Sequence, residues 1–146
     1  MADVNMDRLR ELAGHLRNAV RQLRELSGIP CEQFLADSRA LNSAKSLLIV
    51  AAESSLDICN HLAARRGARS PDDYADCMSI LAEIGVIDDE LMTRLARMAR
   101  CRNLLVHVYG RVDDGRVHRV LQEDLGDFDR YLVAVEGYLG RHVPQA

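Results

Sequence analysis

Apolar residues recur every three to four positions along most of this 146-residue chain, and this spacing constrains the fold more than any other feature. Between Met6 and Leu26 they form a single stripe, at Leu9, Leu12, Leu16, Val20 and Leu23. Such a stripe is one face of an α-helix. No segment alternates apolar and polar residues over a useful length, as a half-buried strand would. The pattern therefore predicts an all-α, up-and-down helical bundle.

Four further helical stretches are predicted, which gives about five helices. The second runs from Cys31 to Arg66, with a bend near Asp37 and Ser38. Gly67 follows two arginines, so it is the expected C-cap of that helix.

The third predicted helix has Ser70 as its N-cap and Pro71 at its first helical position, and it ends near Gly85. The fourth is capped by Asp88 and ends at Gly110. The remaining segment, 116–142, is expected to form one helix or two, with its apolar positions facing inward.

Composition is typical of one globular domain over residues 1–146, with 48% apolar and 28% charged residues. The longest apolar run, 47–52, is too short to cross a bilayer, and the N-terminus lacks the pattern of a signal peptide. We therefore expect a cytoplasmic protein without a membrane partner. Four widely spaced cysteines predict buried free thiols rather than a zinc site or disulfides. The net charge of −3 excludes a surface that is basic throughout, although local patches can still bind phosphate.

A cluster of polar side chains ends the fourth predicted helix, in the stretch RNLLVHVYG at 102–110. At about 100° per residue, Arg102 and Tyr109 lie only about 20° apart, whereas His107 is about 140° from Arg102 and close to Asn103. The polar groups thus occupy two flanks of one helix. A second copy of the helix packed alongside would bring both flanks into one groove, which favours a symmetric dimer.

The stretch RNLLVHVY matches the Arg-x-x-x-x-His-x-Tyr motif of the HEPN superfamily, and residues 37–135 resemble the HepT-like ribonuclease toxins. This resemblance implies a dimer whose two motifs face each other and cleave RNA without a metal or other cofactor. It implies catalytic roles for Arg102 and His107 and a supporting role for Asn103. It also implies that a cognate nucleotidyltransferase antitoxin of the MntA type silences the toxin by adding AMP to Tyr109.

The residue types suit this chemistry. RNA cleavage by its own 2′-hydroxyl needs a proton carrier and positive charge at the phosphate, which an imidazole and a guanidinium supply. AMP on Tyr109 would put bulk and negative charge where RNA phosphate must sit. RNA is therefore the expected substrate, and DNA is not an expected partner. Four basic residues near the motif are candidate RNA contacts: Arg97, Arg100, Arg111 and Arg116.

Glu53, Asp57 and His61 follow one another at intervals of four and share one face of the second predicted helix. These three side chains could orient the motif residues from across the bundle, and Asp57 and His61 are the expected supporting residues. The three could instead bind a metal, but no ligand from another segment is indicated, so no metal is expected. Two other functions stay open: a helical adaptor of a nucleotidyltransferase without nuclease activity, and a bundle enzyme that uses these three residues.

Overall fold

The chain folds entirely into helices and loops within the residues that the computed structural model describes, which are 4–67, 69–107 and 112–142. These residues form seven helices: α1 (Met6–Ser27), α2 (Cys31–Ala36), α3 (Ser38–Arg66), α4 (Tyr74–Glu83), α5 (Asp89–His107), α6 (Asp114–Glu123) and α7 (Gly126–His142). The all-α prediction is confirmed. The expected number of about five helices is too low, because two predicted stretches are each divided by a break.

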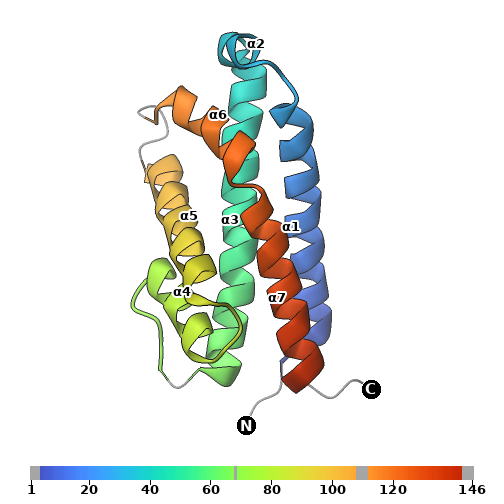
Figure 1. Cartoon of the computed structure of the whole chain (residues 1–146), viewed down its shortest axis with the longest axis vertical. Helices are drawn as coiled ribbons and strands as arrows, with labels where there is room; N and C mark the ends of the chain where they lie inside the picture. The colour runs from blue at the N-terminus through green and yellow to red at the C-terminus, as the bar shows by residue number, and fades with distance from the viewer. Residues whose placement is uncertain (1–3, 68, 108–111, 143–146) are drawn as a thin grey trace.

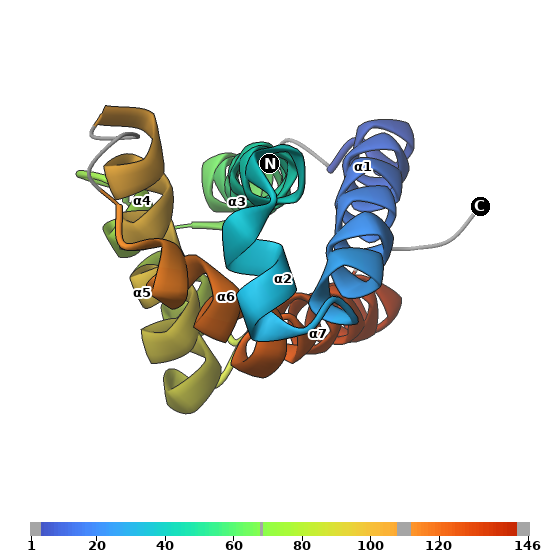
Figure 2. The same cartoon turned by 90° about the horizontal axis from the view of Figure 1, so that it is seen from above.

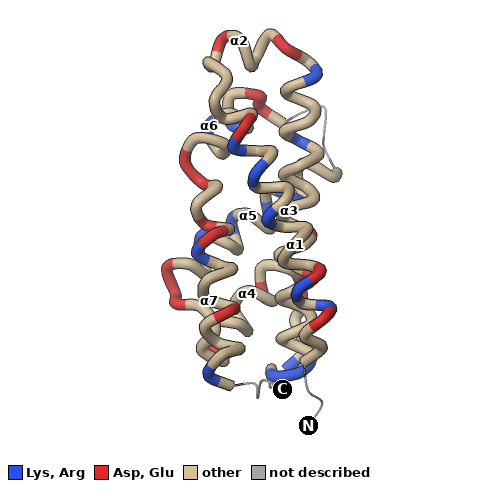
Figure 3. The backbone as a smooth tube through the Cα atoms, turned by 90° about the vertical axis from the view of Figure 1, so that its right-hand side faces the viewer, with Lys and Arg blue, Asp and Glu red and all other residues tan. Residues whose placement is uncertain are grey.

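The long helices run up and down around α3. Figure 1 shows α3 extending along almost the whole molecule, with α1 and α7 on one side and α5 on the other, while α2 covers one end and α4 lies near the opposite end. The view from above shows α6 lying between α5 and α2 (Figure 2). Charged residues of both signs are interspersed along the bundle (Figure 3), and ion pairs such as Arg17 with Glu136 join α1 to α7.

Each of the two helix breaks lies at an aspartate. Asp37 is extended (φ −105°, ψ 100°), and its carboxylate accepts from the backbone N–H groups of Arg39 and Ala40, so α2 ends and α3 begins. Asp124 closes α6 by donating its N–H to the Val120 carbonyl, and α7 starts two residues later. The predicted bend near Asp37 is therefore a full break.

The start of α4 differs from the prediction. The helix begins at Tyr74 rather than Pro71, because Asp73 is the N-cap and its carboxylate accepts from the Asp76 N–H at 2.7 Å. Ser70 and Pro71 remain outside the helix. The residues between them and Tyr74 become a loop beside α5 instead of a first helical turn, and this loop forms part of the site described below.

α3 supplies much of the core. Leu48, Ile58 and Leu62 are fully buried on it, and Ser55 accepts a hydrogen bond at its carbonyl oxygen from the buried Tyr131 hydroxyl, at 2.8 Å. By length and composition α3 could cross a membrane, but 56% of its most apolar window is buried inside the bundle. Packing against the other helices therefore accounts for its apolar character.

The four cysteines are free thiols in two kinds of environment. Cys59 and Cys77 are buried, as predicted, whereas Cys31 is exposed and Cys101 is half-buried. Burial raises the pKa of the Cys59 thiol, so this group stays protonated and is no nucleophile. The expectation that all four are buried is corrected for Cys31, which lies at the start of the short helix α2, and for the half-buried Cys101 on α5.

Candidate active site

The polar cluster at the C-terminal end of α5 opens into a surface hollow of about 480 Å³. Its lining comes from α5, α3, the start of α4 and the loop before α4: Arg102, Asn103, His107, Asn60, Tyr74 and residues 71–73. Helical geometry places Arg102 and His107 on separate flanks. The hollow spans both flanks of the helix. Arg102, Asn103 and His107 therefore line the same hollow within one subunit.

Arg102 is held on three sides. Its Nη2 donates to Glu53 Oε1 on α3 at 2.9 Å, and its Nη1 donates to Asn103 Oδ1 at 3.1 Å. Its guanidinium carbon lies 5.2 Å from the centre of the Tyr74 ring, within the range of a cation–π interaction. Only 16% of the side chain is exposed. The guanidinium thus keeps one orientation before any substrate binds.

One donor of Arg102 has no partner. Its Nε is buried and makes no hydrogen bond within the described part of the chain. A buried donor without an acceptor is costly, so this N–H raises the free energy of the site as it stands. Each Nη also has a second hydrogen that neither Glu53 nor Asn103 accepts, so the side chain combines fixed geometry with a remaining capacity to bind an anion.

His107 has the opposite environment, because it is exposed at the last position of α5. It lines the same hollow as Arg102 and Asn103. An exposed imidazole beside a fixed guanidinium can exchange protons with solvent or with a bound molecule.

The loop that walls the hollow is fixed by Arg69. Its guanidinium donates to both carboxylate oxygens of Asp76, at 2.6 and 2.8 Å, and to Glu83. The Asp72 N–H donates to the same Asp76 carboxylate at 2.9 Å. Arg69 and then this N–H lower the pKa of Asp76 to about 2, so the carboxylate stays charged throughout the neutral range.

The three polar residues on one face of α3 have separate environments. Glu53 contacts Arg102, as described above. His61 lies near the start of α1, where its Nε2 accepts a hydrogen bond from the Asn5 N–H at 2.9 Å. Asp57 is exposed, and no hydrogen bond or ion pair joins it to the motif among the described residues. The supporting position expected of Asp57 and His61 is occupied by Glu53. No group of His, Cys, Asp or Glu in the described ranges is arranged to hold a metal ion.

The arginines expected to contact RNA lie elsewhere on α5 and α6. Arg97 and Arg116 line a second hollow on another flank of α5, and Arg100 is exposed on α5. Tyr109 and Arg111, the other two residues predicted around the motif, lie outside the described residues.

Two residues of the site are not singled out by the sequence. Glu53 is one of three residues expected to be able to orient the motif, but its spacing gives it no preference over Asp57 or His61. Tyr74 carries no signal of its own, since the predicted start of α4 places it inside the helix.

The fold and the site together define a class: an all-helical bundle with an Arg-x-x-x-x-His motif that opens into one surface hollow. Residues 16–135 match the family model described as "Ribonuclease HepT-like". The match covers most of the chain, and the protein therefore belongs to the HepT-like ribonuclease family.

Sequence relatives agree with this assignment. A proposed RNase of Archaeoglobus fulgidus is 35% identical over 97 residues, which are 66% of this chain and 73% of the relative. The mRNA nuclease HepT of Shewanella oneidensis is 25% identical over 121 residues, covering 83% of this chain and 90% of the relative.

Solved structures share the fold. The tri-AMPylated HEPN toxin of Shewanella oneidensis in complex with MNT antitoxin superposes with a TM-score of 0.83 at 24% identity, over 90% of this chain and 98% of that one. The cytosolic protein YutE of Bacillus subtilis superposes with a TM-score of 0.86 at 18% identity, over 100% and 99% of the two chains. At these identities the superpositions establish a common fold.

Proposed function

We propose that this protein is the toxin of a HepT/MntA-type toxin–antitoxin pair, a metal-independent endoribonuclease that acts in the cytoplasm. The observation that carries the proposal is that Arg102 and His107 line one solvent-accessible hollow. Family membership and the names of the relatives support ribonuclease activity.

The two side chains supply the chemistry that RNA cleavage requires. The RNA 2′-oxygen attacks the adjacent phosphorus while the bond from phosphorus to the 5′-oxygen breaks, which leaves a 2′,3′-cyclic phosphate and a 5′-hydroxyl. His107 acts as general acid or base for the protons that move in this step. Arg102 binds the phosphate oxygens as negative charge develops on them, and Asn103 and Glu53 hold its guanidinium in place.

The active form is proposed to be a homodimer. The motif lies at the end of α5, where Leu104 and Val106 are exposed between the catalytic residues. Exposed apolar side chains beside a polar site are typical of a surface that another chain covers. In such a dimer the two motifs face each other and form one groove for RNA.

The proposed antitoxin is an MntA-like nucleotidyltransferase that adds AMP to Tyr109. The solved complex of a tri-AMPylated HEPN toxin with MNT antitoxin supports this pairing, as does the place of Tyr109 two residues after His107. Negative charge and bulk at that place would exclude the phosphate of RNA. Arg97, Arg100, Arg111 and Arg116 are the proposed contacts to the rest of the strand.

The proposal is tested by incubating the purified protein with RNA in EDTA, with single-stranded DNA of the same sequence as the control. RNA is expected to be cut to cyclic-phosphate ends, and DNA is expected to stay intact because it lacks the attacking hydroxyl. His107→Ala is expected to lower the rate by about 10²- to 10⁴-fold. Full activity of that variant, or activity that requires a metal, would overturn the proposal.

The same assay examines regulation. Preincubation with ATP and an MntA-like nucleotidyltransferase is expected to abolish cleavage and to add AMP to the intact mass. Tyr109→Phe is expected to block the mass increase, and an undiminished increase in that variant would place the modification elsewhere.

A further inference from the structure

A second hollow, of about 180 Å³, lies between α5 and the α6–α7 segment. On α5 its lining residues follow a three-to-four spacing from Arg94 to Cys101. At about 100° per residue, the centre of this face lies about 90° from Arg102, about 170° from Asn103 and about 130° from His107. α6 supplies Arg116 and Arg119 from the other side. We call this hollow the arginine pocket.

The charge of the arginine pocket is unbalanced. Four guanidiniums line it, against the two carboxylates of Asp124 and Asp127. Arg94 forms ion pairs with both of these carboxylates. Its Nε lies 2.7 Å from Asp127 Oδ1, and its Nη2 lies 3.5 Å from Asp124 Oδ1. Asp127 is buried, so this pair is a fixed part of the fold.

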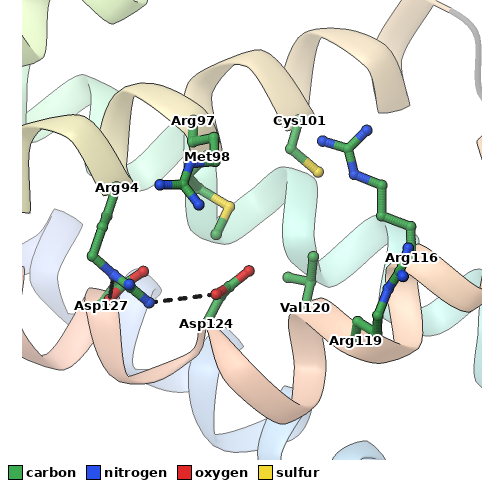
Figure 4. A pocket seen from close by; sticks show the side chains of 9 residues that line it. All are labelled: Arg94, Arg97, Met98, Cys101, Arg116, Arg119, Val120, Asp124 and Asp127. Atoms are coloured by element: carbon green, nitrogen blue, oxygen red, sulfur yellow. Dashed lines mark hydrogen bonds and ion pairs between the residues drawn. The ribbon is translucent and has the colours of Figure 1, made fainter.

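The other three arginines keep their charge available. Arg97, Arg116 and Arg119 form no ion pair with an acid in the described ranges, although the chain as a whole has a net charge of −3. Figure 4 shows the Arg97 guanidinium reaching into the pocket beside Met98, and the Arg116 guanidinium extending toward Cys101. Three unpaired cations converging from two helices attract an anion, and the planar guanidinium matches phosphate in particular.

Packing of α6 against the bundle fixes the positions from which Arg116 and Arg119 extend into the pocket. Lys45 is buried on α3, and its Nζ lies 3.1 Å from the Asp114 carboxylate at the first position of α6. Val117, Val120 and Leu121 bury the inner face of the same helix. Arg116 and Arg119 therefore extend from a helix whose start and inner face are both anchored.

We propose that the arginine pocket binds a backbone phosphate of the RNA strand at a distance from the phosphodiester that is cut. This inference rests on the proposed ribonuclease function and names the part of the protein that holds the strand. Met98 and Val120 give the pocket apolar surface against which a ribose can pack. The helix rise places Arg97 about 15 Å from His107 along α5, so the strand must pass around this helix to reach both places.

The test compares two substrates. A dinucleotide has one phosphodiester, which the motif uses, so it has no second phosphate for the pocket. A longer unstructured RNA can occupy both. The double variant Arg116→Gln/Arg119→Gln is expected to lower kcat/KM for the longer RNA about tenfold more than for the dinucleotide. The double variant Arg21→Gln/Arg141→Gln removes the same charge from exposed positions on α1 and α7 and serves as the matched control.

Binding gives a readout that does not depend on cleavage. In the His107→Ala background, the pocket substitutions are expected to weaken binding of the longer RNA about tenfold. They are also expected to reduce the slope of log K against log salt by about 0.7 for each phosphate that the variant no longer binds.

Three results would overturn either the proposed role of the arginine pocket or the proposed nuclease activity. Equal losses in the pocket and control variants, with cleavage intact, would overturn the pocket and leave the nuclease standing. Absence of all cleavage by the wild type would overturn the nuclease, while the binding comparison still decides the pocket. Saturable binding of inorganic phosphate without any change in RNA affinity on mutation would assign the pocket to a free anion and overturn its role in holding the strand.

Discussion

Arg102 combines two properties that usually exclude each other, because it is largely buried and ion-paired yet has a donor left over. A guanidinium has five N–H groups, and Glu53 and Asn103 accept from two of them. The second hydrogen on each Nη remains for a phosphate. The energetic benefit of such a site lies in orientation that is fixed before the reaction begins.

This view of Glu53 as a positioning residue makes a prediction. Glu53→Gln is expected to lower kcat for RNA cleavage about tenfold, because the guanidinium loses its charged anchor. KM is expected to stay the same or to fall, because a negative charge near the phosphate is removed. Steady-state kinetics with a defined RNA measure both constants.

The control is Glu32→Gln, which removes the same charge from an exposed position on α2. A rise in KM at constant kcat would contradict positioning and indicate a direct role in binding. The Glu53 side chain is 46% exposed, so removal of the ion pair should cost at most about 1 kcal/mol of folding stability.

The sequence predicts the residues of the motif on α5 better than it predicts the residue on α3 that holds Arg102 in place. Arg102, Asn103 and His107 can be identified because all three lie within two turns of one helix. Their partner on α3 cannot, because Glu53, Asp57 and His61 share a face and only the packing of α3 against α5 decides which of them reaches Arg102. A pattern within one helix has no information about the register between two helices.

At the scale of elements, the hydrogen bond from the Asn5 N–H to His61 ties the start of α1 to α3. The bond requires a neutral imidazole, since a protonated ring has no acceptor. Burial lowers the pKa of His61, and the positive charges of Arg65 and Arg8 lower it further. The folded protein therefore binds fewer protons at this site than the unfolded chain does.

The sign of the pH effect follows from this difference. Folding stability is expected to increase as pH rises from the lowered folded-state pKa of His61 through its ordinary value of 6.5, and to decrease as pH falls through the same window. His61→Gln keeps an acceptor but does not titrate, so its melting temperature should fall less between neutral and mildly acidic pH. Thermal unfolding of both proteins across that window measures the difference. Parallel curves would show that His61 does not contribute.

The helix boundaries show where a local sequence pattern is enough to predict the end of a helix and where it is not. The break at Asp37 is indicated by a polar pair inside a long apolar stretch, and the structure turns it into a cap. The start of α4 is predicted too early because Ser70 and Pro71 form a strong local start signal. Arg69 reaches over them to Asp76 and Glu83, and this longer-range network holds the intervening residues as a loop.

At the scale of the whole molecule, the proposed homodimer depends on the exposed apolar residues of α5. Val106→Asp would place a charge in the proposed interface, and it is expected to convert the wild-type dimer, twice the chain mass of 16.3 kDa, into a monomer. Sedimentation equilibrium measures the mass directly. Val133→Asp is the matched control, because Val133 is even more exposed but lies on α7. A wild-type protein that is monomeric and still cuts RNA would refute the dimer.

α5 presents the motif and the arginine pocket on different faces, so the backbone of this one helix sets the angle between them. A residue inserted between Arg97 and Arg102 would turn everything after it by about 100° and carry the histidine away from its hollow. We therefore expect related proteins to keep the number of residues in this stretch constant, whichever side chains they have at its exposed positions.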